Sequence, residues 1–386
     1  MTQENILIVG AGLIGLATAR ALSAQGINFK LIEKNDAWKS DGAGVCLPAN
    51  AVSGFEHLDL KKELLAQAHQ VSSVEYAKAN GTSLAKSSLY EEPLNYQPFV
   101  ALRRSQLHSI LAQDMESKTL FNKSVEAINN KEDAVDVLFN TGETETFDLV
   151  IGADGIHSKT RSLAFENSGE SEFPPLKDMN VTTWRFTIQH DTSDLQPIYH
   201  LGDDSAFMLY PISRNEVYCY AQIVDANESY MQSPAKEILT TLFARYCKDV
   251  TSMIDSIQSD ESVIIGRLVS VQSREIYRKR IVLVGDALHG CPPTLQQGIG
   301  LGVEDALLLA KLLSTHHIDD ALEMFKEKRL ERISWVIDES NRIIQLAAKG
   351  KHWLGRVVRN HMIRKNGPAN VVGWKKLLQE DPLNIS

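Results

Sequence analysis

The sequence predicts an α/β fold with a parallel sheet of the nucleotide-binding type, an inserted antiparallel sheet and a group of C-terminal helices. Three observations support this prediction. The chain opens with a short apolar run that is followed by spaced glycines. Two later apolar runs end in Gly/Asp loops, at residues 152–155 and at residues 285–286. Between these loops, residues 166–274 contain segments that alternate polar and apolar residues, as antiparallel strands do.

The first element is a strand, Ile6 to Val9, which leads through Gly10, Gly12 and Gly15 into a helical pattern that continues to Gln25. In a nucleotide-binding unit the first glycine allows a tight turn and the second lets the backbone approach a pyrophosphate. The third glycine lets the helix pack closely on the strand. The start of the helix offers unpaired N–H groups and the positive end of its dipole to phosphates. We therefore predict a dinucleotide at these glycines.

The second strand, residues 28–32, ends at Glu33, which lies 18 residues after Gly15. This spacing is close to the roughly 20 residues expected before an acidic ribose ligand, which accepts bonds from ribose hydroxyls. The motif does not distinguish NAD from FAD, because both place the same ADP half in this turn. A glycine-rich turn that binds nothing is less favoured, since strand, helix and acid all match.

Composition and charge are those of an ordinary globular chain, with 43% hydrophobic and 23% charged residues. The net charge is −9, and basic residues cluster only at residues 274–280 and 349–365, which argues against a nucleic-acid partner. No apolar run approaches the roughly 18 residues of a membrane span, and a basic region typical of a signal peptide is missing. We expect no membrane partner.

The four cysteines, Cys46, Cys219, Cys247 and Cys291, lie far apart and form no C-x-x-C pair. This spacing indicates neither a zinc site nor a redox dithiol, so we expect no metal. Each cysteine is expected to act as a small apolar core residue. Free thiols of this kind fit a reducing, cytoplasmic location.

The segment after the second strand, residues 35–54, is predicted as an irregular loop with a Gly-Ala-Gly sequence. Its glycines indicate backbone close to a ligand, around Gly44 and Val45, although a plain surface loop is equally consistent. A helix is expected over residues 55–69, and antiparallel strands over residues 71–101.

Arg103 and Arg104 open an amphipathic helix in which Leu107, Ile110 and Leu111 share one face. Positive side chains at a helix start oppose the helix dipole. On spacing alone two interpretations are equal: a solvated pair, or an arginine placed for an anionic or carbonyl-rich ligand.

Two further loops follow buried strands. The strand at residues 149–152 is followed by Asp154, and Ser158 is placed to cap the next helix. The strand at residues 280–284 is followed by Asp286. Parallel strands deliver both aspartates to the carboxyl edge of the sheet, where ligands bind in open α/β folds. A loop with two prolines then leads to glycines at another helix start, which again offers N–H groups.

Strands are expected at residues 180–189, 205–210 and 216–224, with aromatic residues concentrated in them. One face of this sheet is available for a flat ligand, but aromatic residues that simply form its core are an equally weighted alternative. Strand alternation puts three residues of the first strand on one face. We predict that some of five residues line the substrate: Thr183, Arg185, Thr187, Met208 and Tyr210.

The last part of the chain is predicted to be helical, with helices over residues 319–348, 352–364 and 373–380. Earlier, a helix is expected over residues 234–247 and a strand over residues 262–273.

The three motifs, GAGLIG with Glu33, GADG at 152–155 and GDALHGCPP…QGIG at 285–300, together resemble the class A flavoprotein monooxygenases related to para-hydroxybenzoate hydroxylase. The resemblance covers nearly the whole chain. It implies a discontinuous Rossmann-like FAD-binding domain (1–70, 100–165 and 275–318) and a substrate-binding domain (71–99 and 166–274). It also implies long bridging helices (319–366) and a C-terminal helix near the substrate cavity (367–386).

The resemblance implies the following cofactor contacts. The ADP half of FAD is held by Gly10, Gly12, Gly15 and Glu33. Other parts of FAD are met by Arg104 on the flavin side, Asp154 at the pyrophosphate, Asp286 at the ribityl chain, and Pro293, Gly298, Gly300 and Leu301 around the isoalloxazine. Two positions depart from the family: Ile299 stands where Asn is usual, and Lys34 stands where many relatives carry Arg, which keeps the charge but not the bidentate geometry.

The implied activity is that of a monooxygenase. NADPH or NADH reduces the flavin, O2 adds to give a C4a-hydroperoxide, and one oxygen atom passes to an electron-rich carbon of an aromatic or polyketide substrate. No nucleophile–base pair is needed, and none is evident. An NAD-linked dehydrogenase would leave the Asp286 loop unexplained, and a non-enzymatic nucleotide-binding module would leave the aromatic sheet unexplained.

Within the family, the size and closing helices are most similar to those of the tetracycline destructases. This resemblance implies tetracycline inactivation, with the helix after residue 368 placed beside a large ligand. A smaller phenol or another secondary metabolite is the alternative substrate. We expect a monomer.

Overall fold

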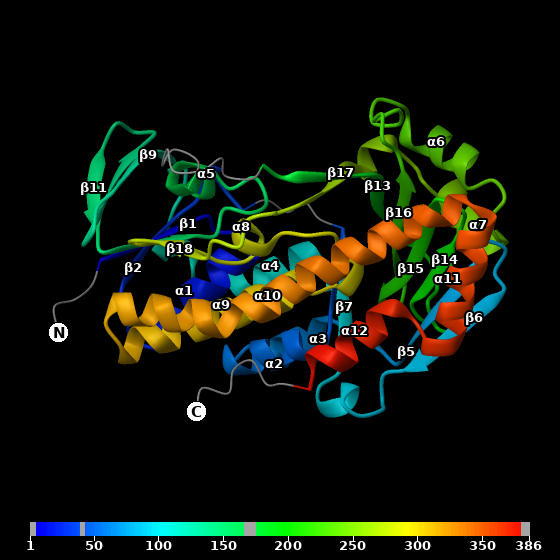
Figure 1. Cartoon of the computed structure of the whole chain (residues 1–386), viewed down its shortest axis with the longest axis horizontal. Coiled ribbons are helices and arrows are strands. Elements are labelled where there is room, and N and C mark those ends of the chain that lie inside the picture. The colour runs from blue at the N-terminus through cyan, green and yellow to red at the C-terminus, as the bar shows by residue number, and fades with distance from the viewer. Residues whose placement is uncertain (1–4, 39–42, 166–174, 380–386) are drawn as a thin grey trace.

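The computed structural model gives the fold of residues 5–38, 43–165 and 175–379, and it has the predicted α/β architecture (Figure 1). Its first layer is a six-stranded sheet in which five strands run parallel and one edge strand, β18, runs antiparallel. In spatial order the strands are β18 (Tyr277–Arg278), β19 (Ile281–Leu283), β12 (Leu149–Gly152), β1 (Ile6–Val9), β2 (Phe29–Ile32) and β8 (Thr119–Leu120). The four strands predicted for the parallel sheet are all present in it.

Helices cover this sheet. Every residue of β1 and β12 is buried, as expected for central parallel strands that are covered on both faces. The helix after β1, α1 (Leu13–Ala24), packs against β1 and β2, and also against α4 (Arg104–Ala112) and α9 (Gly298–Thr315). The core of the parallel sheet therefore continues through α1 into α9.

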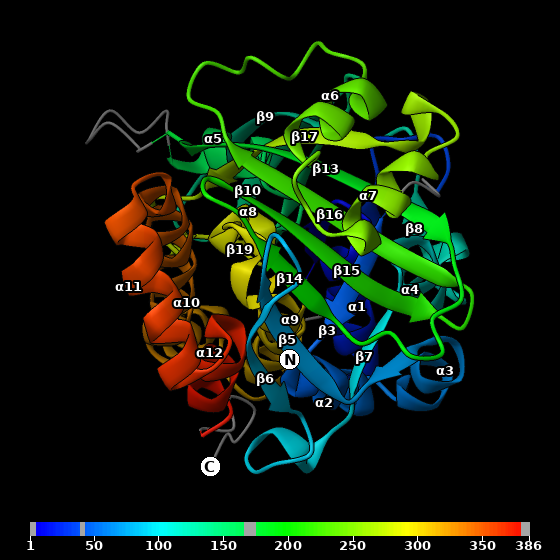
Figure 2. The same ribbon diagram turned by 90° about the vertical axis from the view of Figure 1, so that its right-hand side faces the viewer.

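A second sheet of seven strands forms the other half of the molecule. Its spatial order is β17 (Ile264–Ser270), β13 (Lys177–Gln189), β16 (Glu216–Val224), β15 (Ser205–Ser213), β14 (Ile198–Leu201), β5 (Ser73–Lys78) and β6 (Ser83–Ser88). Only β14 and β5 pair in parallel. Figure 2 shows the central strands crossing the view with α6 (Ala235–Leu242) and α7 (Lys248–Asp255) in front of them. The early segment that carries β5 and β6 thus shares a sheet with strands more than a hundred residues later.

Two small sheets and several short helices complete the connections. The small sheets are β3 (Gly44–Leu47), β7 (Phe99–Arg103) and β4 (His69–Val71), and β11 (Thr144–Phe147), β10 (Val135–Phe139) and β9 (Val125–Asn130). The short helices are α2 (Ala49–His57), α3 (Lys61–Gln67), α5 (Lys159–Phe165), α8 (Asp286–His289), η1 (Leu94–Tyr96), η2 (Glu116–Lys118), η4 (Asp260–Ser262), η5 (Pro293–Leu295) and η6 (Lys349–Lys351).

Three predicted elements were wrong in detail. The single helix over 55–69 is two helices, because Asp59 takes a φ of +57° and the N–H of Leu60 bonds the carbonyl of Phe55, which ends α2. The irregular loop over 35–54 contains β3 and the start of α2. The helix over 234–247 ends at Leu242, and α7, which follows it, was not predicted. Asp41 and Gly42 lie outside the described residues.

Three helices close the chain. The longest, α10 (Ile318–Ala348), runs from beside the six-stranded sheet toward the seven-stranded sheet (Figure 1). It is followed by α11 (Trp353–Asn366) and α12 (Ala369–Leu377). The last helix begins four residues before the predicted start at residue 373, because its first turn contains Asn370 and Val371, both buried.

A buried ionic network joins α9 to α10. Asp305 accepts a hydrogen bond from Arg329 Nε at 2.7 Å and Glu304 accepts one from Arg329 Nη1 at 2.8 Å. All three side chains are at most 1% exposed. Burial alone would raise the pKa of both carboxyl groups, but Arg329, together with Arg332 at Glu304 and His289 at Asp305, outweighs it and lowers both pKa values.

Replacing Arg329 by methionine should destabilise the protein by about 3–5 kcal/mol, because it leaves two carboxylates buried without their shared partner. The measurement is urea unfolding of the flavin-loaded protein, followed by tryptophan fluorescence. Arg342→Met, which removes an exposed pair with Glu339, is the control and should cost less than about 1 kcal/mol.

The destabilisation should depend on pH. Because the folded-state pKa values of Glu304 and Asp305 are lowered, the pairing energy is complete above about pH 4.3, the ordinary Glu value, and is lost as the pH falls through the folded-state values. The difference between wild type and Arg329→Met should therefore shrink in acid. A difference that stays constant down to pH values where wild type unfolds would contradict this assignment.

Candidate cofactor and substrate site

Four candidate residues or turns follow neighbouring strands of the parallel sheet. The glycine turn follows β1, Glu33 follows β2, Asp154 follows β12 and Asp286 follows β19. Because these strands are adjacent and parallel, their carboxyl ends lie at one edge. The sheet thus brings together the residues that the three sequence motifs supply.

The glycine turn has the geometry that a close backbone approach requires. Gly10 has a φ of +98°, and a β-carbon there would lie 2.8 Å from the carbonyl oxygen of Ala153. A β-carbon at Gly15 would lie 1.8 Å from the carbonyl oxygen of Gly10. Gly12 caps α1 without a side chain, and the space where its β-carbon would lie is open. The first amides of α1 therefore face an opening suited to phosphate.

Glu33, which directly follows β2, holds this turn through a hydrogen bond. Its carboxylate accepts hydrogen bonds from the amide of Ala11 at 3.0 Å and from the amide of Asn35 at 3.0 Å. The side chain is half-buried, whereas that of Lys34 is exposed. One carboxylate thus holds both the glycine turn and the chain after β2.

Asp154 is engaged within the protein. Its carboxylate accepts bonds from the hydroxyl of Ser158 and from both the amide and the hydroxyl of Thr160, at 2.9 and 3.0 Å. Ser158 in turn accepts from the amide of Arg161 at 2.9 Å, which confirms its predicted capping role. The Asp154 carboxylate therefore organises the start of α5, and the loop contacts Gly10 through its backbone.

Asp286 and Arg104 lie near each other without a bond to the protein. Both side chains are exposed, and neither makes a hydrogen bond or ion pair within the described part of the chain. A β-carbon at Gly298 would lie 3.5 Å from Asp286 Oδ1, so this carboxylate faces the start of α9. The pKa of Arg104 is lowered, mainly because the surrounding protein excludes water from the guanidinium. The negative charge of Asp286 opposes this shift, and the positive charge of Arg185 adds to it. Arg104 is thus exposed and lies close to both Asp286 and Arg185.

The neighbouring Arg103 has a different role. Its guanidinium pairs with the carboxylate of Glu216 on β16, with a distance of 2.8 Å from Nε to Oε2. The structure thus distinguishes two arginines that sequence spacing had left equal: Arg103 joins the small β3–β7–β4 sheet to the seven-stranded sheet, and Arg104 stays available.

The start of α9 is tightly packed. Pro293 and Gly298 are exposed, whereas Gly300 and Leu301 are buried. A β-carbon at Gly300 would lie 2.8 Å from Asn50 Nδ2, which also bonds Gln297 Oε1 at 2.8 Å. The amide of Leu301 donates to the carbonyl of Gln297 within the helix. Only the amides before Leu301 are therefore left for a ligand at this helix start.

The loop around Gly44 reaches the second sheet. Gly44 and Val45 lie in β3 and pair with Arg103 and Leu102. A β-carbon at Gly44 would lie 2.5 Å from Cγ of Tyr218, so only glycine lets β3 pass so close to this ring. Backbone of the first domain thus borders the tyrosine side of the seven-stranded sheet.

The seven-stranded sheet has two different faces. Trp184, Phe186 and Phe207 lie in the core that packs under α6 and α7. The strand registers put the opposite residues on the other face. That face carries all five predicted substrate residues, Thr183, Arg185, Thr187, Met208 and Tyr210, together with Tyr76, Tyr199, Tyr218 and Tyr220.

Arg185 is the charged group of this face. It is half-buried, and its buried Nε has no hydrogen-bond partner among the described residues. Burial raises the pKa of Tyr218 and Tyr220, and Arg185 partly opposes this. Arg185 also influences Arg104, which links this face to the edge that presents Asp286. A cation with an unsatisfied donor beside neutral tyrosines is suited to an anionic or carbonyl oxygen.

The C-terminal helix closes one side of the same face. The hydroxyl of Tyr199 accepts from Gln296 Nε2 at 2.7 Å and from Asn370 Nδ2 at 3.2 Å. Trp374 is fully buried and donates to the carbonyl of Leu295 at 2.7 Å. The helix is therefore bonded both to the sheet and to η5.

Sequence reasoning did not identify Tyr199, Gln296 or Asn370. They come from a strand of four residues, a residue with left-handed backbone and a helix whose start had been predicted too late. Two cross-strand pairs in the β15–β16 register could have been found by aligning the alternation of those strands, since Tyr210 faces Tyr218 and Met208 faces Tyr220.

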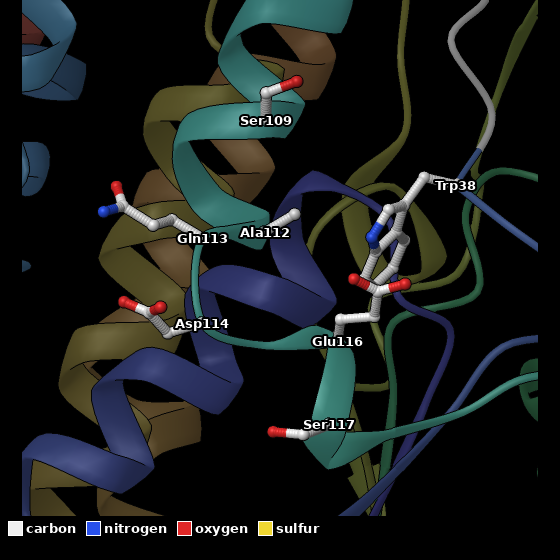
Figure 3. A pocket seen from close by; sticks show the side chains of 7 residues that line it. All are labelled: Trp38, Ser109, Ala112, Gln113, Asp114, Glu116 and Ser117. Atoms are coloured by element: carbon white, nitrogen blue, oxygen red, sulfur yellow. The ribbon is translucent and has the colours of Figure 1, made fainter.

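A separate shallow recess lies at the end of α4, beside Trp38 (Figure 3). It is lined by Trp38, Ser109, Ala112, Gln113, Asp114, Glu116 and Ser117. The Trp38 ring packs against His108 with centroids 5.2 Å apart, and His108 Nε2 lies 3.1 Å from the carbonyl of Ala11. The recess thus backs onto the Glu33 side of the turn and contains none of the charged residues around Asp286.

Within the described residues, no group of three or more His, Cys, Asp and Glu side chains is arranged to hold a metal ion. In the same part of the chain, no helix is both long and apolar enough to cross a membrane.

These features fit FAD: an uncapped helix start for a pyrophosphate, an acid at the next strand end, and the unbonded Asp286 and Arg104 farther along the edge. The sequence matches the protein family described as FAD binding domain over residues 3–340. The chain belongs to this family. It is an FAD-dependent monooxygenase of the aromatic hydroxylase type, as curated relatives of the same family are named.

Two curated relatives illustrate the range of proteins to which the chain is similar. The chain is 28% identical to 2-heptyl-3-hydroxy-4(1H)-quinolone synthase of Pseudomonas aeruginosa, over 93% of this chain and 94% of that protein. It is 26% identical to 6-hydroxynicotinate 3-monooxygenase of Bordetella bronchiseptica, over 86% of this chain and 90% of that protein.

Solved structures share the fold. HpxO of Klebsiella pneumoniae, complexed with FAD and uric acid, has a TM-score of 0.87 at 20% identity, and the match covers 98% of this chain and 97% of HpxO. The tetracycline destructase Tet(55) has a TM-score of 0.71 at 20% identity, and the match covers 100% of this chain and 98% of that protein.

Asp286→Ala should weaken FAD binding tenfold or more, because a lost charge-assisted hydrogen bond costs about 1.5–3 kcal/mol. Titration of the apoprotein with FAD, followed by quenching of flavin fluorescence, measures the affinity. Asp194→Ala, which removes an exposed carboxylate on a distant loop, is the matched control. Wild-type affinity in Asp286→Ala would refute this role.

Proposed function

We propose that this monooxygenase uses NADPH or NADH and O2 to hydroxylate a flat, oxygen-bearing aromatic ring that binds against the Arg185 face of the seven-stranded sheet. The reaction consumes one NAD(P)H, one proton and one O2, forms one C–OH from a ring C–H, and releases NAD(P)+ and water. FAD, when bound, supplies the oxygen-activating chemistry. The protein supplies binding, orientation and electrostatics.

The observation that carries the proposal is the unsatisfied, half-buried guanidinium of Arg185. A positive charge close to a ring hydroxyl favours its ionised form, typically lowering its pKa by 1–3 units. Ionisation makes the ring carbon a better nucleophile toward an electrophilic oxygen. The tyrosines nearby stay neutral because burial raises their pKa values, so they act as hydrogen-bond donors and stacking surfaces.

The cofactor edge has a separate task. Asp286 and Arg104 are charged side chains without a hydrogen-bond or ion-pair partner among the described residues, and Arg104 lies near both Asp286 and Arg185. We assign Asp286 to the ribityl hydroxyls and Arg104 to the flavin side. Gly10, Gly12 and Gly15 provide the backbone approach for the pyrophosphate, and Glu33 accepts from the adenosine ribose.

The preferred substrate is a compact ring system such as a quinolone, a hydroxypyridine or a phenol. The relatives named above act on, or are named for, rings of this kind. Bonds from Gln296 and Asn370 to Tyr199, and the buried Trp374, fill one side of the Arg185 face, which favours a compact ligand. Tetracycline inactivation is the second candidate, supported by the full-length fold similarity to the destructase.

A substrate panel distinguishes the two candidates. We expect an alkyl-4(1H)-quinolone, 6-hydroxynicotinate or salicylate to accelerate NADPH or NADH oxidation tenfold or more over the rate without substrate, with a product that has gained one oxygen atom. Mass spectrometry and NAD(P)H absorbance in air are the readouts. Oxygenation of tetracycline with no reaction of the smaller rings would favour the second candidate. Full consumption of reductant as peroxide with every compound would contradict both.

Arg185→Met should leave FAD bound while it raises KM for an ionisable substrate and moves the pH dependence of kcat upward by about one unit or more. The reason is that the substrate hydroxyl loses the cation that favours its ionised form. Arg185→Lys keeps the charge and should restore most of the pH profile. A profile unchanged in Arg185→Met would show that this cation does not act on the substrate.

A further inference from the structure

Helix α11 presents apolar side chains to solvent. Trp353, Leu354, Val357 and Val358 are between 57% and 65% exposed, and Met362 is 43% exposed. With about 3.6 residues per turn, these five side chains share one half of the helix, and we call them the α11 stripe. Contiguous exposed apolar groups of this kind mark interaction surfaces in soluble proteins.

The opposite half of α11 is bonded to the protein through polar groups. Arg356 Nη1 lies 2.6 Å from an oxygen of Asp203, and Arg359 Nη2 donates to the carbonyl of Gly202 at 2.9 Å. Ile363 is buried beside them. This is the reverse of an ordinary surface helix, which turns its apolar side to the core. Because the arginines fix its rotation, the helix cannot turn the α11 stripe inward.

The charged side chains of α11 and its flanking residues are all positive, and one of them, Arg356, is paired with Asp203 of the neighbouring loop. Residues 349–365 contain six lysine and arginine residues and no aspartate or glutamate, in a chain whose net charge is −9. Lys349, Lys351, Arg364 and Lys365 are exposed at the two ends of the helix, and none makes an ion pair with another described residue. The complementary partner is therefore anionic as well as apolar.

We propose that α11 docks the protein peripherally on an anionic phospholipid membrane. A bilayer surface accepts the α11 stripe at the boundary of the acyl chains while its headgroups meet the basic ends. A second copy of the chain, docked through the same face, would bring like charges together. Nucleic acid would satisfy the charges and leave the α11 stripe in water.

The position of α11 suits this role. It lies at the edge of the molecule, outside α10 and α12 (Figure 2), and it packs against β6 and α12. From the sequence, no membrane partner was expected, because the chain has no long apolar run. Residues 349–365 are nevertheless basic, although the net charge of the chain is negative. The docking proposal uses this cluster and does not depend on the identity of the substrate.

The experiment is co-sedimentation of the flavin-loaded protein with vesicles. Wild type should bind vesicles of phosphatidylcholine with phosphatidylglycerol about tenfold or more tightly than vesicles of phosphatidylcholine alone, and high salt should weaken this binding. Leu354→Ser with Val357→Ser should reduce it about tenfold or more, because the apolar contact is lost. Arg364→Gln with Lys365→Gln should remove most of the preference for anionic lipid.

The matched control is Leu138→Ser, an exposed apolar position on β10, which should bind like wild type. Strand β10 lies between β9 and β11, which Figure 1 shows at the end of the molecule away from α11. Flavin absorbance verifies that each variant is folded. Trp353→Phe should still bind but lose the blue shift of fluorescence that vesicles cause. The proposal would be overturned if wild type sedimented equally with both lipids or did not sediment at all. It would also be overturned if Leu354→Ser with Val357→Ser left the binding unchanged. Light scattering that shows a dimer which this double variant dissociates would overturn it as well.

Discussion

The buried pairing of Arg329 with Glu304 and Asp305 is the interaction on which the cofactor edge depends. Asp305 also accepts from the amide of Gly285 at 3.0 Å, and Arg329 donates to the carbonyl of Leu301 at 3.0 Å. Gly285, at a φ of +60°, directly precedes Asp286. One network therefore holds both the turn that presents Asp286 and the start of α9, and it does so from α10. Its charges tolerate burial only because each has a partner.

The same network extends to the substrate side. Arg332 binds Glu304 through two nitrogens and donates to the carbonyl of Leu377 at 2.8 Å. Leu377 ends α12, whose Trp374 is fully buried and bonded to Leu295. The C-terminal helix is thus anchored at both sides and belongs to the folded core. It is fixed beside the Arg185 face of the seven-stranded sheet, so a deletion of this helix would expose core residues as well as that face.

The sequence predicted what short-range patterns determine. Buried strands, glycine turns and the Ser158 cap each depend on a few neighbouring residues, and they were found. Contacts between distant segments were not predicted. Arg103 differs from Arg104 because it pairs with Glu216, which lies 113 residues after Arg103 in the sequence. Asp154 stays a predicted pyrophosphate contact, and the structure adds that its carboxylate bonds Ser158 and Thr160. The turn at Asp59 was not predicted because a non-glycine residue adopts a φ of +57° there.

The two proposals place different partners at different parts of the molecule. Ile363 on α11 shares a hydrophobic cluster with Tyr76, Met208 and Tyr210, so a membrane at α11 lies on the same side of the seven-stranded sheet as the Arg185 face. The strand ends that carry Gly10 and Asp286 belong to the other sheet. A charged, water-soluble reductant must reach the flavin at that edge, and docking through α11 leaves the edge in solution. An apolar ring substrate that partitions into lipid would be concentrated near the seven-stranded sheet, beside which α11 lies. Substrate and reductant would then approach from different sides, so docking through the apolar side of α11 is compatible with catalysis at the cofactor edge.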